Sequence, residues 1–213
     1  MPDLYIITGS NGAGKSSVGP EYLPVHLRST VFDGDKLFVN KRNEIWNSGI
    51  RSPKECSRIA MEYVQTTFDN LVNDHIHEEC DFAYEGHFTN DATWDVPLRF
   101  KQRGFHIHLI FFGLSGTTLS ETRVLARSKE GGHYVDPQTI ANNYFGNLEK
   151  LDVHFEMFDS VQIIDTSGFE HIALAVLNNG VCFSAMEAFS LPPWFSTYLP
   201  NIHKRINNYL EQF

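Results

Sequence analysis

Residues 9–16 read GSNGAGKS and match the phosphate-loop pattern G-x-x-x-x-G-K-[ST] at every fixed position. The apolar run at residues 4–7 (LYII) comes directly before this stretch and has the composition of a buried strand. Glycines let the backbone N–H groups curl around an anion at φ values that a Cβ would resist. A following helix would direct its first N–H groups at the same phosphates. The stretch therefore predicts a nucleoside triphosphate site between a strand and a helix.

The loop residues have separate predicted roles. We expect Lys15 to reach the β- and γ-phosphate oxygens and the Ser16 hydroxyl to bind Mg²⁺. Gly19 and Pro20 lie early in the predicted helix, so we expect that helix to be short or kinked. The residues predicted to bind ATP are Gly9, Asn11, Gly12, Ala13, Gly14, Lys15, Ser16 and Ser17.

Further apolar runs continue the strand pattern along the chain. They lie at residues 29–32, 82–84, 105–112 and 161–164. Stretches with helical spacing separate them, for example at residues 54–73 and 118–128. This alternation predicts an α/β fold of the P-loop NTPase type, with a five-stranded parallel sheet and helices on both faces.

The end of the chain is less regular. Residues 181–183 are either an extra strand or an apolar loop, and two prolines at residues 192–193 precede a final helix at about residues 198–212. The sequence contains no repeat and no linker. We interpret residues 1–213 as a single P-loop domain, with a core at about 1–170 and a C-terminal helical extension at about 171–213.

Composition narrows the class of protein. The 213 residues are 42% apolar and 20% charged, as in a globular chain. With 26 acidic and 17 basic residues the net charge is −9, whereas a general nucleic-acid binder carries a basic footprint. The sequence contains no signal peptide and no apolar run of membrane-spanning length. We therefore expect a cytoplasmic protein with neither a nucleic-acid nor a membrane partner.

Size and motifs separate the kinds of P-loop protein. A G-protein reads guanine with Asn-Lys-x-Asp, and the nearest stretch, NKRN at residues 40–43, lacks the aspartate. Motor-type ATPases need a longer chain. Small phosphotransferases have about this length. They combine a five-stranded parallel sheet with a substrate-binding acid near the second strand and an arginine-bearing lid.

Several polar residues follow the predicted strands. Asp33 and Asp35 come after the second strand, and Glu85 closes the third. The carboxyl ends of parallel strands share one crevice, so these carboxylates would meet there. We predict Asp35 as the group that accepts or orients the acceptor hydroxyl proton, and Asp33, Glu85 and Thr89 as substrate-binding residues. The alternative is a set of solvated turn and strand-end side chains.

Two arginines mark a candidate lid. Arg123 and Arg127 are four residues apart and share one face of a helix predicted at residues 118–129. Glycines at residues 131–132 end that helix and offer a hinge. We predict that both arginines contact the transferring phosphoryl group, the alternative being a solvated helix face.

Taken together, these stretches resemble the zeta-toxin family of P-loop kinases. The matching strings are LYIIT at 4–8, VFDGD at 31–35, DFAYE at 81–85 and RVLARSKEGGHYV at 123–135. The resemblance covers about residues 4–168. It implies ATP-dependent phosphorylation of a hydroxyl group, with Asp35 as general base and Lys15 and the lid arginines on the phosphates. Members include UDP-N-acetylglucosamine kinases, so the implied acceptor is a small molecule, and the implied protein partner is an antitoxin.

Two departures from the family pattern leave alternatives open. Relatives tend to carry an arginine pair before a tyrosine where residues 141–144 read ANNY, so a nucleotide-binding regulatory or scaffold protein without transferase activity is the second interpretation. The loop after Glu85 reads GHFT, where relatives more often have Thr or Ser at once, which leaves UDP-sugar specificity open. A third interpretation, phosphoryl transfer to a nucleic-acid end, is disfavoured by the charge of −9.

Overall fold

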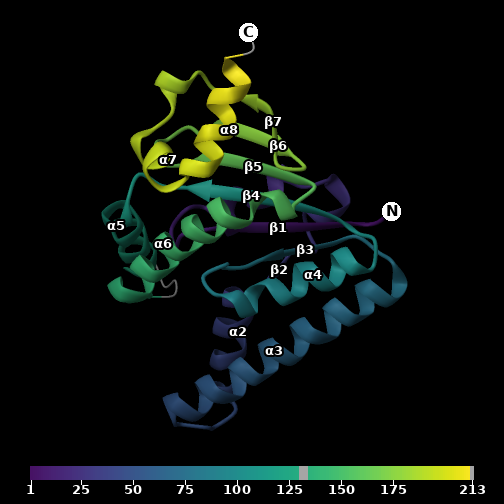
Figure 1. Ribbon diagram of the computed structural model, residues 1–213. Coiled ribbons are helices and arrows are strands. Elements are labelled where there is room, and N and C mark those ends of the chain that lie inside the picture. Colours follow the sequence, from purple (N-terminus) through teal and green to yellow (C-terminus); the bar gives the residue numbers. More distant parts are fainter. Residues whose placement is uncertain (130–133, 212–213) are drawn as a thin grey trace.

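The computed structural model describes residues 1–129 and 134–211, which form a sheet of seven strands in the order β2-β3-β1-β4-β5-β6-β7 (Figure 1). The strands β2, β3, β1, β4 and β5 run parallel to their neighbours, and β6 and β7 add on in antiparallel fashion. The strands are β1 (Asp3–Gly9), β2 (Phe32–Asp33), β3 (Phe82–Glu85), β4 (His106–Gly113), β5 (Ser160–Asp165), β6 (Ile172–Asn178) and β7 (Val181–Ala185).

Helices cover this sheet, with α4, α6 and α8 on the face turned toward the viewer in Figure 1. The helices are α1 (Lys15–Val18), α2 (Gly34–Asn47), α3 (Pro53–Glu78), α4 (Asp95–Gln102), α5 (Thr117–Lys129), α6 (Pro137–His154), α7 (Pro193–Tyr198) and α8 (Pro200–Leu210). The predicted α/β fold with a parallel P-loop sheet is therefore confirmed.

The strand count of five was too low. The extra strands β6 and β7 form a hairpin whose turn, Asn179-Gly180, has φ values of 49° and 73°. Positive φ at both turn residues matches the twist of a two-residue hairpin, and Asn-Gly tolerates it. Residues 181–183 are thus part of a strand, and the C-terminal extension is a hairpin followed by two short helices rather than purely helical.

Proline shapes two other elements. The helix after the phosphate loop, α1, has only four residues and passes into a 3₁₀ helix at Gly19–Tyr22 that contains Pro20, so the expected short helix is confirmed. The predicted final helix corresponds to α8, which begins at Pro200, and a separate short helix, α7, starts at Pro193 within the predicted break. Gln212, the expected last residue of the final helix, lies outside the described residues.

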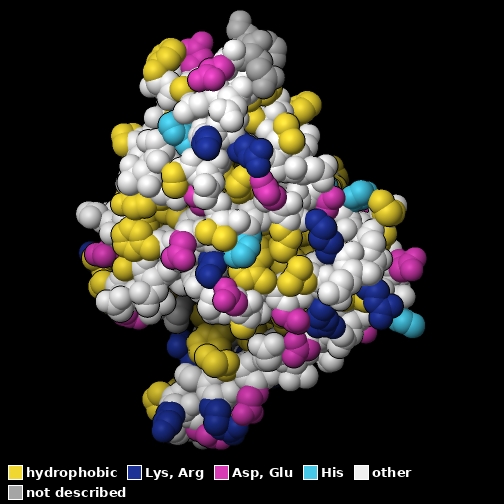
Figure 2. Space-filling view, in the orientation of Figure 1, with side chains coloured by type: hydrophobic (Ala, Val, Ile, Leu, Met, Phe, Trp, Pro, Cys, Tyr) yellow, Lys and Arg dark blue, Asp and Glu magenta, His cyan; other side chains and the backbone are white. Residues whose placement is uncertain are grey.

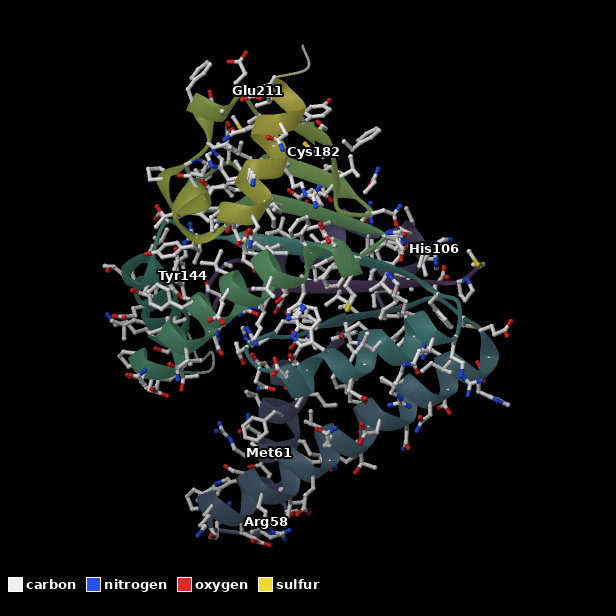
Figure 3. All side chains as sticks on the ribbon, viewed as in Figure 1. Arg58, Met61, His106, Tyr144, Cys182 and Glu211 are labelled. Carbon is white, nitrogen blue, oxygen red and sulfur yellow. The ribbon has the colours of Figure 1, made fainter. Side chains whose placement is uncertain are left out.

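The core is rich in phenylalanine and continues from β1 into α8. Phe100, Phe111, Phe112, Phe158 and Phe195 are fully buried, and Leu4, Ile202 and Ile206 belong to the same apolar cluster. The α2–α3 pair projects from the body and has a small cluster of its own around Ile45, Cys56 and Ala60 (Figure 1). Figure 3 shows Arg58 and Met61 of α3 in this projecting part, far from Tyr144 of α6.

Charges of both signs are interspersed on the face shown in Figure 2. None of the described helices is both long enough and apolar enough to cross a membrane. All three cysteines are free thiols.

Candidate functional site

The phosphate loop starts where β1 meets β4. Gly9 has φ 137° and is the register partner of Phe112, and a Cβ at this position would collide with the Phe112 carbonyl oxygen. Gly14 has φ 90° and caps α1 in a left-handed conformation. Both positions therefore require glycine, because an L side chain resists these φ values.

Side chains from three other elements hold the loop in place. Thr166 Oγ1 donates to the Ala13 carbonyl at 2.9 Å, and Ser120 Oγ of α5 donates to the Asn11 carbonyl. Asn143 Nδ2 of α6 donates to Asn11 Oδ1 at 2.8 Å. All of these bonds use oxygen atoms of the loop, so they fix its shape without occupying the N–H groups that an anion would need.

Lys15 folds back onto the loop that carries it. Its Nζ donates to the Gly9 carbonyl at 2.9 Å and to the Ser10 carbonyl at 3.0 Å. Burial lowers the pKa of Lys15 to about 8, although the carboxylates of Glu85 and Asp35 partly oppose this shift. An ammonium group held by two neutral carbonyls is in position to exchange them for phosphate oxygens.

Three carboxylates gather beside the loop. Asp33 ends β2 in register with Glu85 at the end of β3, and Asp33 Oδ1 caps α2 by accepting from the Lys36 N–H at 2.9 Å. Asp35 lies exposed in the first turn of α2. Glu85 Oε2 accepts from Ser16 Oγ at 2.9 Å. Burial, together with the neighbouring charge of Asp33, raises the pKa of Glu85 to about 7.

The lid helix α5 brings both predicted arginines to the same place. Arg123 Nη2 donates to the Ser167 carbonyl at 3.1 Å, and Nη1 donates to the Gly12 carbonyl at 3.4 Å. Arg123 thus joins the phosphate loop to the connection after β5. Arg127 is close enough for its charge to lower the pKa of Lys15. The predicted glycine hinge at 131–132 lies outside the described residues.

A pocket of about 150 Å³, which we call the phosphate pocket, unites most of the predicted groups. It is lined by Asn11, Gly12, Ala13, Gly14, Lys15, Ser16, Ser17, Asp35, Glu85, Arg123 and Arg127. Gly9 lies at the base of the loop as an acceptor for Lys15. Two other predicted residues, Asp33 and Thr89, are not among the described residues that line this pocket. Asp33 lies beside Glu85, and Thr89 packs against Gly146 of α6.

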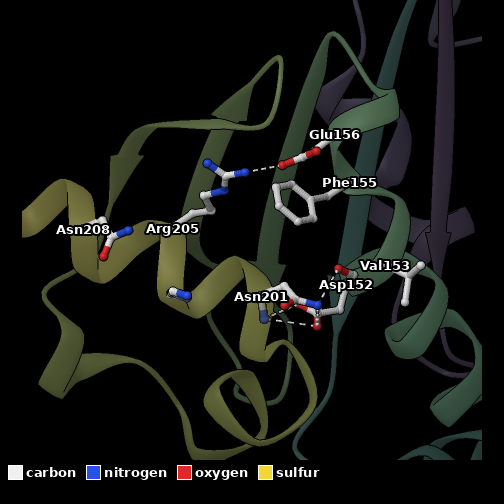
Figure 4. Close-up of a pocket in the computed structure, with 8 residues that line it drawn as sticks. Asp152, Val153, Phe155, Glu156, Asn201, Arg205 and Asn208 are labelled. Atoms are coloured by element: carbon white, nitrogen blue, oxygen red, sulfur yellow. Dashed lines mark hydrogen bonds and ion pairs between the residues drawn. The ribbon is translucent and has the colours of Figure 1, made fainter.

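A larger pocket of about 490 Å³ lies between α6 and α8 (Figure 4). Four of its polar side chains, those of Asp152, Asn201, Glu156 and Arg205, make contacts within the pocket. Asp152 Oδ1 accepts from the N–H groups of Asn201 and Ile202, both at 3.0 Å, and Arg205 pairs with Glu156. Because Asp152 caps α8 in this way, we interpret these contacts as support for the helix junction.

Sequence reasoning missed a role for α6. Asn147 is buried, and its Oδ1 accepts from the Phe88 N–H at 2.7 Å and from Thr8 Oγ1 at 3.1 Å. Its Nδ2 donates to the Asn143 carbonyl at 2.6 Å and to His87 Nδ1 at 3.0 Å. One amide therefore ties β1 and the loop after β3 to the helix that holds Asn11. The available signal was a pair of asparagines four residues apart on an otherwise apolar helix face.

The residues present fit ATP with Mg²⁺. The Ser16 hydroxyl and the Glu85 carboxylate are hard oxygen donors of the kind Mg²⁺ prefers, and they lie 2.9 Å apart next to Lys15. Within residues 1–129 and 134–211, no group of three or more His, Cys, Asp or Glu side chains could hold a metal by itself. Ser16 and Glu85 supply two such donors, which suits an ion whose other ligands are phosphate oxygens and water.

Known proteins share sequence or fold with this chain. The family model described as Zeta toxin matches residues 1–173. An uncharacterized protein from Haemophilus influenzae is 23% identical over 136 residues, which is 64% of this chain and 88% of the relative. A structure from the PezAT chromosomal toxin–antitoxin system of Streptococcus pneumoniae has a TM-score of 0.57 at 18% identity, covering 99% of this chain and 88% of its own.

Similar structures also come from the AvrRxo1-ORF1:AvrRxo1-ORF2 pair. The structure with sulphate ions has a TM-score of 0.73 at 14% identity, and the structure with ATP has 0.72 at 14% identity. In both, the alignment covers 93% of this chain but 64% of the other, so this chain spans less than two thirds of that protein's length. At these identities the likeness concerns the fold.

Proposed function

Because the chain belongs to the zeta-toxin family, we propose that it transfers the γ-phosphoryl group of ATP to a hydroxyl group of a small-molecule acceptor. The family assignment supports a nucleotide-binding, kinase-like function. The observation that carries the finer proposal is the phosphate pocket, in which the phosphate loop, Asp35, Glu85 and two arginines line one cavity.

Each group has a part in this reaction. Lys15 and Arg127 neutralise the charge on the phosphate oxygens, and Arg123 keeps the loop in shape. The acceptor oxygen forms a bond to the γ-phosphorus while the bond from that phosphorus to the β–γ bridging oxygen breaks and ADP leaves. Asp35 accepts the proton of the acceptor hydroxyl. Mg²⁺ supplies charge neutralisation between the phosphates when it is bound, and Ser16 and Glu85 would hold it.

An antitoxin protein is the partner we propose. The support is the family assignment and the similarity to a structure from the PezAT toxin–antitoxin system. The test is to co-express the chain with the protein encoded by the adjacent gene and to measure ATP turnover with and without that protein. An antitoxin should bind the chain and suppress its turnover of ATP.

One observation favours a second candidate, a nucleotide-binding regulatory protein. Asn143 stands where relatives tend to carry an arginine, and it holds Asn11 of the phosphate loop by a neutral hydrogen bond of 2.8 Å. A neutral amide at this position keeps the phosphate loop in shape for binding ATP, but it supplies no positive charge for the transferring phosphoryl group. This favours a protein that binds ATP without transferring its phosphate.

The deciding experiment measures ADP formation by wild type and Asp35→Asn, with Mg²⁺ and a panel of hexoses, nucleosides and nucleotide sugars. Asp74→Asn, an exposed change on α3, is the matched control. We expect acceptor-stimulated turnover that falls by about 10²–10⁴-fold in Asp35→Asn, with the affinity for ATP retained. Unchanged turnover in Asp35→Asn would remove the proposed base, and ATP binding without product from any acceptor would favour the regulatory protein.

A further inference from the structure

A second pocket adjoins the phosphate pocket, and Glu85 lines both. We call it the aromatic pocket, and its volume is about 320 Å³, within the range of small-molecule sites. It is lined by Phe32, Val64, Gln65, Phe68, Tyr84, Glu85, Gly86, His87, Phe88, Ala92, Thr93 and Val96. A molecule bound here would therefore lie next to the groups that we assign to phosphoryl transfer.

Four aromatic side chains, those of Phe32, Phe68, Tyr84 and Phe88, line this pocket. The ring centroids of Phe32 and Phe68 are 5.0 Å apart, and those of Phe68 and Tyr84 are 5.2 Å apart. Phe88 is buried against Trp94, with centroids 4.8 Å apart. Such a lining favours a planar or apolar ring in the ligand, because rings stack in offset or edge-to-face geometry at these separations.

The two pockets differ in charge. Lys15, Arg123 and Arg127 line the phosphate pocket, whereas no lysine or arginine is among the described residues that line the aromatic pocket. The ionisable carboxyl group there belongs to Glu85. A phosphate group placed in such surroundings would lose water without gaining a cation, which is unfavourable.

Hydrogen bonds to Asn147 fix the proton of His87. The Phe88 N–H can only donate, so the Asn147 atom at 2.7 Å from it is the oxygen. The nitrogen Nδ2 therefore donates to His87 Nδ1 at 3.0 Å, which leaves the imidazole proton on Nε2. An imidazole whose Nδ1 accepts a hydrogen bond carries one proton and no charge, so the ring is neutral in this arrangement. His87 is thus a neutral polar group in the wall of the aromatic pocket.

From these observations we propose that the aromatic pocket binds the acceptor, and that the acceptor is an uncharged compound with a planar or apolar ring near its reactive hydroxyl group, rather than a nucleoside diphosphate sugar. The inference rests on the proposed function, since it names the acceptor class of the same site. Glu85 lies at the junction of the two pockets and Asp35 lines the phosphate pocket, so the hydroxyl would meet the γ-phosphate near these two carboxylates.

Matched pairs of ligands test the charge preference. Uridine, adenosine and phenyl glucoside are compared with their phosphorylated counterparts, UDP, ADP and phenyl glucoside 6-phosphate. Binding to the full chain is followed by calorimetry while a non-hydrolysable ATP analogue and Mg²⁺ occupy the phosphate loop. We expect at least one neutral probe to bind at least about tenfold more tightly than its phosphorylated partner. Tighter binding of the phosphorylated members, or no binding by any neutral probe, would overturn the proposal.

Three variants place the binding in the aromatic pocket. Phe68→Ala should weaken binding of the neutral probe by about tenfold. Phe183→Ala, which removes an exposed aromatic ring on β7, should leave that binding unchanged. Gln65 is exposed at the edge of the pocket, so Gln65→Lys preserves the fold and adds a cation. It should shift the preference toward the phosphorylated partner by about fivefold. An unchanged preference in Gln65→Lys would place the ligand elsewhere.

The failure of each proposal has a different signature. Binding of neutral probes that responds to Phe68→Ala and Gln65→Lys, without phosphorylated product from any acceptor, would contradict the proposed kinase and leave the pocket assignment standing. Product formed from UDP-N-acetylglucosamine at the same rate in wild type and Phe68→Ala would contradict the aromatic pocket and leave the kinase standing.

Discussion

Ser16 Oγ donates a hydrogen bond of 2.9 Å to Glu85 Oε2, which joins the start of α1 to the end of β3. The hydroxyl that the phosphate-loop pattern assigns to Mg²⁺ is therefore held by a carboxyl group from another strand. Burial raises the pKa of this same carboxyl group to about 7. The predicted metal position is thus in direct contact with a carboxyl group whose pKa is raised by burial.

Glu85→Gln should change how stability depends on pH. The pKa of Glu85 is about 7 in the folded protein against 4.5 ordinarily, so between these values the folded chain keeps a proton that the unfolded chain has released. The free energy of unfolding therefore falls as the pH rises from 4.5 to 7. Glutamine does not ionise, so the stability of Glu85→Gln relative to wild type should increase by about 1–2 kcal/mol from pH 5 to pH 8, after allowance for solvent screening. Urea unfolding without nucleotide measures this.

The control for this titration is Glu149→Gln, an exposed carboxamide change on α6. It should follow the pH dependence of wild type. If Glu85→Gln also ran parallel to wild type between pH 5 and pH 8, the carboxyl group would not be protonated in the neutral range.

Lys15 should make the binding of ATP depend on pH in the alkaline range. Its pKa in the free protein is about 8, and phosphate oxygens favour the charged form. Above pH 8 the free protein must take up a proton on binding, so the Kd for a non-hydrolysable ATP analogue should rise by up to about tenfold per pH unit. Lys15→Arg keeps its charge and should abolish this slope, although it binds more weakly. Equal slopes in the two proteins would place the titration on another group.

How far the sequence predicted the structure depends on whether the signal was local. The glycines of the phosphate loop carry a local signal for their backbone conformation, so the strand, loop and short helix around Lys15 could be predicted from a few adjacent residues. The hairpin at Asn179-Gly180 carried a local turn signal that the parallel-sheet interpretation overlooked. The role of Asn147 had no comparable signal, because its partners Thr8 and Phe88 are far away in the chain and meet only after folding.

Asn147→Ala should destabilise the protein far more than Asn142→Ala on the same helix. The first change leaves the buried Phe88 N–H and Thr8 hydroxyl without their acceptor, and the expected loss is about 2–4 kcal/mol. Asn142 is exposed and bonds only to Gln138 among the described contacts, so its replacement should stay within about 0.5 kcal/mol. Thermal and urea unfolding compare the two. Similar losses would show that the buried network contributes little.

The two lid arginines should affect different kinetic constants. Arg123 bridges the Gly12 and Ser167 carbonyls, so Arg123→Ala should loosen the loop and mainly raise the Kd for ATP. Arg123→Lys should restore little, because an ammonium group lacks the fork that reaches both carbonyls. Arg127 lines the phosphate pocket beside Lys15, so Arg127→Ala should mainly lower kcat, by about 10²-fold or more. Steady-state kinetics measure kcat, and a binding titration measures the Kd for ATP. Equal changes in kcat and Kd for both variants would contradict this division.

Gly113→Ala tests whether the C-terminal helices are part of the same cooperative unit as the P-loop core. Gly113 ends β4, and a Cβ on it would overlap the ring of Trp194, which α7 places against the sheet. Both ring and backbone are buried, so the clash should cost about 1–3 kcal/mol. At Gly116 a Cβ would meet open space, so Gly116→Ala is the matched control and should change stability by less than about 0.5 kcal/mol.

A double-mutant cycle makes that test specific. On a Trp194→Ala background the ring is gone, so Gly113→Ala should lose most of its cost, and the coupling energy should be about 1–3 kcal/mol. If residues 171–213 were instead an independent extension, Gly113→Ala would shift only the part of an unfolding curve that reports on α7 and α8. Because Trp194 and Phe195 share one apolar cluster with Leu4 of β1, we expect a single transition in which the nucleotide site and the C-terminal helices are lost together.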